Sequence, residues 1–123
     1  MVSVVVVEDH GWLREALVCA LSDTAGLEVV GSCEDGATAV DLVLRARPDV
    51  VIMDLRLPTL DGAEATTRIL EVWPEARILI HTSAADSTRA KVAMVNGAVA
   101  LVAKAVSLEP LVRAIYDVHA GVR

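Results

Sequence analysis

The sequence predicts a three-layer α/β sandwich, in which helices cover both faces of a five-stranded parallel sheet. Five short runs rich in Val, Ile and Leu alternate with five longer segments whose apolar residues recur at helical spacing. The runs are nearly continuous in hydropathy, which is typical of strands covered on both faces. Right-handed crossovers between parallel strands then place helices on both sides of the sheet.

The expected strands cover residues 2–7, 27–32, 49–54, 77–82 and 99–103. The expected helices carry their apolar stripes over residues 13–21, 37–44, 65–73, 89–96 and 108–119. Helix-end signals agree with this division, since Asp61 and Ser107 are candidate N-caps and Asn96–Gly97 is a candidate C-cap.

Length and composition favour one domain over residues 1–123, because 54% of its residues are apolar and can form a core without metal or disulfide support. A net charge of -6 argues against direct binding to a nucleic-acid backbone. Cys19 and Cys33 are expected to be free thiols. The apolar start runs into Glu8–Asp9 without a basic leader, and no apolar run could span a bilayer, so we expect a cytoplasmic domain without membrane contact.

Polar side chains stand where four of the expected strands end. Glu8 and Asp9 follow the first strand, Asp54 ends the third, Thr82 ends the fourth and Lys104 follows the fifth. The carboxyl ends of parallel strands meet at one edge of a sheet, so these groups should lie together. Clustered carboxylates need a cation, and oxygen ligands of this kind suit Mg²⁺. Beside that ion, Asp54 could attack a phosphoryl group and form an acyl phosphate.

Other polar or aromatic residues near these strand ends favour plainer roles. We expect His10 to begin the first helix, and His81 and His119 to be structural. Trp12 is expected either to line the entrance of the site or to be a half-buried helix residue.

Four stretches carry a resemblance to a known family: VVVVEDHGWLREAL, PDVVIMDLRLPTLDGAEATTRI, ILIHTSA and NGAVALVAK. With them the chain resembles, over nearly its whole length, the receiver domain of bacterial two-component response regulators. The EDH opening, the MDLRLPTLDG segment and the AVSLEPLVRAIYDVHAG ending are most similar to the NarL/FixJ (LuxR-type) subfamily. The resemblance implies the flavodoxin-like (βα)5 fold with strand order 2-1-3-4-5.

The resemblance also implies roles for individual residues. Asp54 corresponds to the phospho-acceptor, Thr82 to the switch hydroxyl and Lys104 to the lysine that pairs with the phosphoryl group. The Mg²⁺ ligands would be Asp9 directly, Glu8 through water, Asp54, and the backbone carbonyl of Arg56.

Further positions match or depart from the family pattern around these residues. Pro58 and Gly62 match the loop after the acceptor strand, where Pro fixes the turn and Gly would permit a positive φ. Leu101 stands where the family usually has Tyr or Phe, and Ala105 where many members have a cis proline. The output surface of the family would include Leu101, Val102, Val112 and Tyr116.

The function implied is a phosphorylation-dependent switch rather than an enzyme. A sensor histidine kinase would donate the phosphoryl group, a homodimer is possible, and DNA would be contacted only through a C-terminal helix-turn-helix domain outside these residues. An alternative is a receiver-like interaction module that is never phosphorylated. A flavodoxin-like or phosphatase-type enzyme is a third class. However, Glu8-Asp9-His10 follows the first strand in place of the Ser/Thr-rich loop that flavin binding would need, and the second Asp followed by Gly-Thr that a haloacid-dehalogenase-type phosphatase would need is missing.

Overall fold

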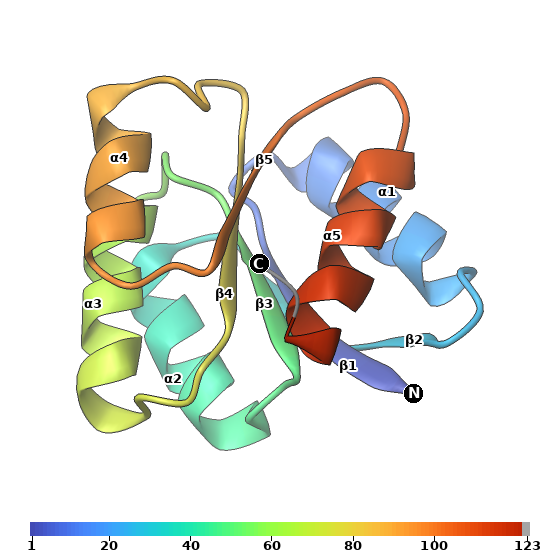
Figure 1. The fold of residues 1–123 in the computed structure, drawn as a ribbon, viewed down its shortest axis with the longest axis horizontal. Helices are drawn as coiled ribbons and strands as arrows, with labels where there is room; N and C mark the ends of the chain where they lie inside the picture. Colours follow the sequence, from blue (N-terminus) through green and yellow to red (C-terminus); the bar gives the residue numbers. More distant parts are fainter. Residues whose placement is uncertain (122–123) are drawn as a thin grey trace.

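Strands and helices alternate five times in the computed structural model, which describes residues 1–121 (Figure 1). The strands are β1 (Val2–Val7), β2 (Leu27–Cys33), β3 (Val50–Met53), β4 (Ile78–Thr82) and β5 (Ala100–Ala103). The helices are α1 (Gly11–Ser22), α2 (Gly36–Ala46), α3 (Gly62–Val72), α4 (Thr88–Val95) and α5 (Glu109–Ala120). Within residues 1–121, no helix combines the length and hydropathy needed to cross a lipid bilayer.

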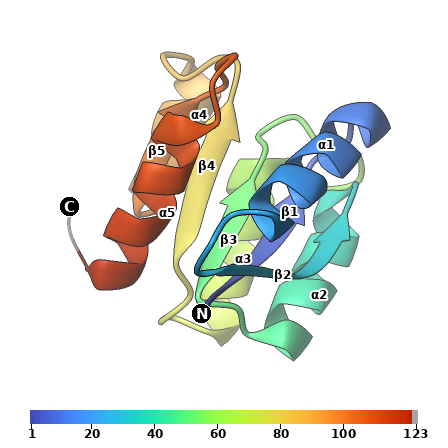
Figure 2. The ribbon, with the colours of Figure 1, turned by 90° about the vertical axis from the view of Figure 1, so that its right-hand side faces the viewer.

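All strand pairs are parallel, and the sheet order is β2-β1-β3-β4-β5. Helices α1 and α5 cover one face, and α2, α3 and α4 cover the other (Figures 1 and 2). The predicted flavodoxin-like fold and its strand order are therefore confirmed.

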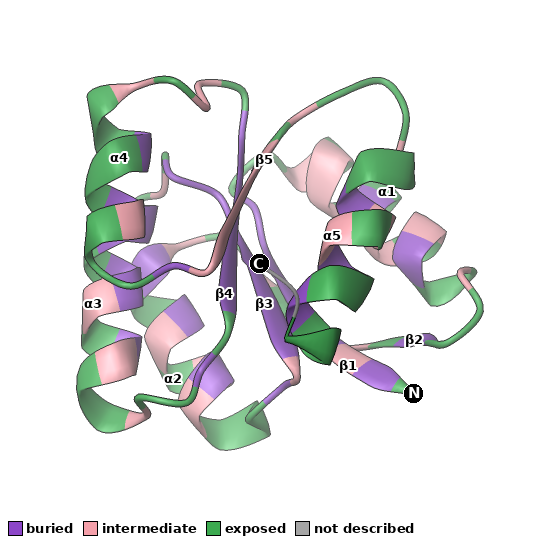
Figure 3. Cartoon of the chain, in the orientation of Figure 1, coloured by how far each residue is buried: buried purple, intermediate pink, exposed green. Residues whose placement is uncertain are grey.

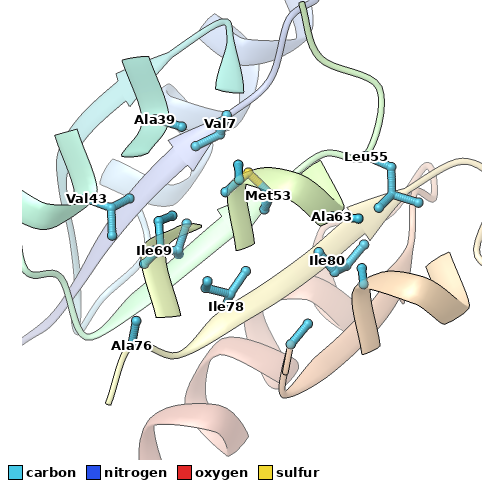
Figure 4. Packing of buried hydrophobic residues seen from close by; sticks show 14 of the residues in the cluster. Val7, Ala39, Val43, Met53, Leu55, Ala63, Ile69, Ala76, Ile78 and Ile80 are labelled. Carbon is cyan, nitrogen blue, oxygen red and sulfur yellow. The ribbon is translucent and has the colours of Figure 1, made fainter. Parts of the chain in front are cut away.

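Alternate residues of each central strand enter two separate cores. Val5 and Val7 of β1 face α2, α3 and α4, whereas Val4 and Val6 face α1 and α5. Figure 4 shows the first core, where Ile69 of α3 lies among side chains from the strands and from α2. These side chains are almost all aliphatic. Val, Ile, Leu and Ala therefore fill the two cores by shape complementarity, where many other proteins use aromatic side chains.

Coverage on both faces holds for β1, β3 and β4 but not for the edge strands. Buried and more exposed residues alternate along β2, and the residues of β5 are mostly half-buried (Figure 3). Edge strands have a neighbour on one side only, so their side chains are less enclosed. The pairing of β2 with β1 also shifts register between Val4 and Val5, which leaves Val30 as a bulge that is 40% exposed.

The helix ends agree with the sequence signals except at α5. Asp61 caps α3 by accepting a hydrogen bond from Glu64 N at 2.9 Å, and Asn96 is the C-cap of α4. Ser107 is not the N-cap of α5, which is Leu108, although the Ser107 hydroxyl accepts a 3.3 Å bond from Glu109 N. Pro110 in the first turn of α5 suits a helix start, because a first-turn N–H has no partner within the helix.

Two side chains fasten the C-terminal half of α5. The Tyr116 hydroxyl donates to the Ala25 carbonyl in the loop between α1 and β2. Arg77 Nη1 donates to the His119 carbonyl at 2.8 Å, at the C-terminal end of the helix. Tyr116 therefore points toward the start of β2, and away from the output surface on which the family resemblance placed it.

The imidazole of His81 is buried on the α1/α5 side of β4. Its residue is 7% exposed and lines a cavity of about 230 Å³ with Leu13, Leu108 and Leu111. Burial, followed by the nearby positive charge of Lys104, lowers the pKa of His81 to about 4. The ring is therefore neutral at pH 7, as a structural histidine should be.

We expect His81 to make the free energy of unfolding decrease at acidic pH. Its pKa is lower in the folded chain than the unfolded value of 6.5, so its contribution is present above pH 6.5 and is lost as the pH falls toward 4. Between pH 7 and pH 4.5 the free energy of unfolding should fall by about 2 kcal/mol more in the natural chain than in His81→Gln. Urea unfolding of both proteins at the two pH values measures this, and equal losses would contradict it.

Candidate functional site

Asp54 leaves the end of β3 as a buried carboxylate. The residue is 6% exposed, its N–H donates to the Val7 carbonyl at 3.1 Å, and Leu55 N donates to its Oδ1 at 2.7 Å. The backbone bond continues the β1–β3 ladder by one residue, so the carboxylate is held at the end of a central strand that is buried throughout.

Lys104 joins two of the acids with one ammonium group. Its Nζ lies 2.7 Å from Glu8 Oε1 and 3.0 Å from Asp54 Oδ2. The backbone N–H of Lys104 donates to the Thr82 carbonyl at 2.8 Å, which extends the β4–β5 pairing. One side chain therefore connects the ends of β1, β3 and β5.

The protonation of this group follows from burial and pairing. Burial raises the pKa of the Glu8 carboxyl above its usual range, and hydrogen bonds from Lys104 and from the His10 N–H only partly offset this. Burial would lower the pKa of Lys104, but its hydrogen bonds to Glu8 and Asp54 outweigh burial and raise it. Lys104 is therefore firmly cationic at neutral pH.

One open cavity of about 340 Å³ collects the residues expected from the strand ends. Its lining includes Glu8, Asp9, Asp54, Arg56, Thr82 and Lys104. Thr82 is buried, and its Oγ1 accepts a 3.1 Å hydrogen bond from Ala84 N at the start of the following loop. The hydroxyl hydrogen of Thr82 can still be donated to a ligand in the cavity.

The carboxylates of Glu8, Asp9 and Asp54 could hold a metal ion together. One oxygen from each lies within 4.8 Å of the others, and Asp9 is exposed where the other two are buried. Hard oxygen donors at one edge fit Mg²⁺, which keeps several waters and takes few protein ligands. The charges fit as well, since the carboxylates of Glu8, Asp9 and Asp54 outnumber the positive charges of Lys104 and Arg56 in the lining of the cavity, which leaves an excess of negative charge for a cation.

Gly62 lies where the backbone of α3 crosses that of Asp54. A Cβ built there would stand 2.1 Å from the Asp54 carbonyl oxygen, and Gly62 N donates to Leu55 O at 2.8 Å. The expectation of a positive φ at Gly62 is wrong, because the described glycines with positive φ are Gly26, Gly97 and Gly121. Glycine is needed here for close approach, and not for a left-handed backbone.

Thr59 has the left-handed conformation in this loop instead, with a φ of 66°. Its Oγ1 donates to Asp35 Oδ1 at 3.1 Å and accepts from Ala37 N at 3.0 Å. A left-handed β-branched residue costs about 1–2 kcal/mol, which these two bonds to the start of α2 offset. The loop after Asp54, which contains Pro58, is thereby tied to α2.

Three further residues lie beside the acid pair, and the prediction that His10 begins the first helix is confirmed. His10 is the N-cap of α1, its Nδ1 accepting from Leu13 N at 3.3 Å. Trp12 lines the cavity and is 74% exposed, so of its two expected roles the half-buried one is wrong. Arg14 Nη1 donates to the Glu8 carbonyl at 2.9 Å, a role that no pattern signalled because a helix arginine usually lies on a solvated face.

Comparison with known proteins gives a consistent result. The family model of the response regulator receiver domain matches residues 4–116. The chain is 35% identical, over 123 residues, to the response regulator GacA of Pseudomonas aeruginosa, and 39% identical, over 121 residues, to the DNA-binding transcriptional activator DevR/DosR of Mycobacterium tuberculosis. It covers 58% of the first and 56% of the second, so the chain spans a little over half the length of these relatives.

Solved structures show the same likeness in three dimensions. A LuxR-family two-component response regulator from Aurantimonas sp. SI85-9A1 is 36% identical, with a TM-score of 0.93. The superposition covers 100% of this chain and 88% of that one. The backbone that carries the candidate site is therefore shared closely with that regulator.

We expect Gly62→Ala to destabilise the chain, because the new methyl group can be admitted only by moving the backbone of Asp54. The free energy of unfolding should fall by about 3 kcal/mol. Gly11→Ala is a matched control at the first residue of α1, where a Cβ would meet only Arg14 Nη2 at 3.8 Å. Chemical unfolding compares the two variants, and similar stabilities would refute the close-approach argument.

Proposed function

Because the chain belongs to the response regulator receiver domain family, in its NarL/FixJ (LuxR-type) branch, we propose that Asp54 accepts a phosphoryl group and that the chain acts as a phosphorylation-dependent switch. The proposal treats residues 1–123 as one receiver domain. Receiver domains are signalling domains rather than enzymes in the usual sense, so phosphorylation would alter the state of the chain itself.

The observation that carries this proposal is the Lys104 ammonium between Glu8 and Asp54, beside the exposed acid Asp9. Lys104 alone could make a single buried carboxylate purely structural. Here three carboxylates gather at the wall of an open cavity, and their mutual repulsion favours the binding of a cation. A divalent cation with a phosphoryl group would complete this cluster.

The positions of the two Asp54 oxygens support phosphoryl transfer to this residue. Oδ1 accepts the Leu55 N–H, which fixes the plane of the carboxylate, and Oδ2 faces Lys104. A carboxylate oxygen would attack phosphorus in line as the bond from phosphorus to the donor breaks, so that the donor leaves with the bonding pair and Asp54 becomes an acyl phosphate.

Lys104 and Thr82 would respond to the new charge. The ammonium would exchange its bond to Asp54 for one to a phosphoryl oxygen, and its bond to Glu8 would keep it in place meanwhile. The Thr82 hydroxyl would donate to another phosphoryl oxygen, which would draw the loop that begins at Ala84 toward the site. The added charge of about -1.5 to -2 would thus shift an existing equilibrium between two arrangements of this loop and α4.

Mg²⁺ fits the acid edge of the cavity as the cofactor of this reaction. Asp9 and Asp54 would bind it directly, together with the backbone carbonyl of Arg56, and Glu8 would contribute through water. When bound, the ion supplies neutralising charge for the carboxylates and the phosphoryl oxygens.

The proposed donor is the phosphohistidine of a sensor histidine kinase, and the chain would act in the cytoplasm. The proposed output is control of transcription, since relatives include a DNA-binding transcriptional activator. DNA binding would belong to a C-terminal helix-turn-helix domain in a longer protein, and homodimerisation of the receiver would accompany activation. The net charge of -6 supports an output through protein contacts and not through direct DNA binding by these residues.

We expect incubation with acetyl phosphate to add one phosphoryl group in the presence of Mg²⁺. Intact-mass spectrometry should show the gain in the natural chain and in Asp41→Ala, which removes an exposed acid of α2, but not in Asp54→Ala. Hydroxylamine should remove the added mass, because it cleaves acyl phosphates.

A gain that persists in Asp54→Ala would refute the assignment of the acceptor. No gain from acetyl phosphate or from a phosphorylated histidine kinase, combined with the absence of Mg²⁺ binding in calorimetry, would overturn the switch and favour a module that is never phosphorylated.

A further inference from the structure

Arg14 reaches from the first turns of α1 back to the end of β1. Its Nη1 donates to the Glu8 carbonyl at 2.9 Å and lies 3.7 Å from Glu34 Oε2, at the start of the loop between β2 and α2. The Arg14 side chain is 20% exposed and that of Glu34 is 67% exposed. The bond to the carbonyl is therefore sheltered, whereas the ion pair is screened by water and contributes little.

The Glu8 carbonyl belongs to the peptide that joins the two acids of the cavity. This peptide group is planar, so the direction of the carbonyl also fixes the Asp9 N–H and the direction in which the chain leaves toward the Asp9 side chain. On its other side, Glu8 N donates to the Cys33 carbonyl at 3.0 Å. With both bonds made, the backbone of Glu8 is held between β2 and α1.

The hydrogen bond from Arg14 to the Glu8 carbonyl matters most for Asp9. The Glu8 carboxylate is already held by Lys104 and by the His10 N–H at 3.1 Å, but Asp9 is exposed at the cavity wall. The position of the Asp9 carboxylate thus depends mainly on the backbone that carries it. Groups that orient metal ligands through such secondary hydrogen bonds typically affect metal affinity by 10- to 100-fold.

We propose that Arg14 is a positioning residue for the acid pair, whose hydrogen bond to the Glu8 carbonyl holds the Glu8–Asp9 peptide in the orientation that binds Mg²⁺. The inference rests on the proposed function, since it assigns a metal to this edge of the cavity. It adds a residue that touches neither metal nor phosphoryl group and acts through the backbone alone.

Calorimetric titration of the whole chain with Mg²⁺ tests this assignment. Arg14→Met keeps the length of the side chain and its helix propensity but removes every donor, and we expect it to weaken binding by about tenfold. Glu34→Gln is the matched control, because it removes the ion pair and leaves the bond to Glu8, and its affinity should stay within about twofold of the natural chain. Arg14→Lys, which keeps a cationic donor, should bind more tightly than Arg14→Met.

A second measurement needs no metal. The Asp9 amide shares its peptide plane with the Glu8 carbonyl, so its ¹⁵N chemical shift in the metal-free chain should move in Arg14→Met and not in Glu34→Gln. Arg14→Ala serves both measurements if Arg14→Met does not fold, as judged by circular dichroism.

Affinity within twofold of the natural chain in Arg14→Met, or an equal loss in Glu34→Gln, would overturn the positioning role. A natural chain that binds no Mg²⁺ would instead contradict the proposed function, and an unmoved Asp9 amide in Arg14→Met would then separately contradict the restraint on the peptide.

Discussion

The structure at the carboxyl ends of the strands depends on the ammonium of Lys104, which pairs with two buried carboxylates. Glu8 and Asp54 end neighbouring central strands and are both buried, so without a cation the repulsion between their carboxylates would destabilise this edge of the sheet. Lys104 comes from the loop after β5, two strands away from β3 in the sheet order. Its two bonds therefore link the ends of β1, β3 and β5, and one side chain offsets the charge of both buried acids.

The loops around this edge are held by close backbone contacts as well as by charge. Gly62 lets the start of α3 touch the carbonyl of Asp54, and Gly36 allows the same at α2, where a Cβ would stand 2.0 Å from the Leu60 carbonyl oxygen. Thr59 has an unfavourable left-handed φ, and its hydroxyl donates a hydrogen bond to Asp35. The loop after Asp54 is thus fixed at both ends and in its middle, whereas the loop after Thr82 is held at its start mainly by the bond from Ala84 N to the hydroxyl. Under the proposed function, phosphorylation of Asp54 would therefore move the loop after Thr82 more easily than the loop after Asp54.

Periodicity and the family resemblance predicted the strand order, the element sequence and the residues gathered in the cavity. The element sequence depends on hydropathy patterns, and the gathering of the site residues depends on the rule that parallel strands end together. The strand order was implied by the family resemblance alone. The reason for Gly62, the left-handed Thr59 and the bond from Arg14 to Glu8 could not be predicted, because each depends on contacts between loops distant in sequence. The prediction that strands are covered on both faces does not hold for β2 and β5. Hydropathy alone does not reveal which strands lie at the edges of the sheet.

The core on the α1/α5 face has a consequence for how the chain matures during translation. Leu17 and Leu21 of α1 are buried against the same cluster as Leu111 and Ile115 of α5, which are the first and fifth helices of this domain in order of synthesis. Until α5 emerges, the apolar face of β1 and β3 stays uncovered beside α1. Helix α1 therefore cannot reach its final environment before α5 has been synthesised, and a chain stalled before residue 109 would expose aliphatic surface of the kind that chaperones bind.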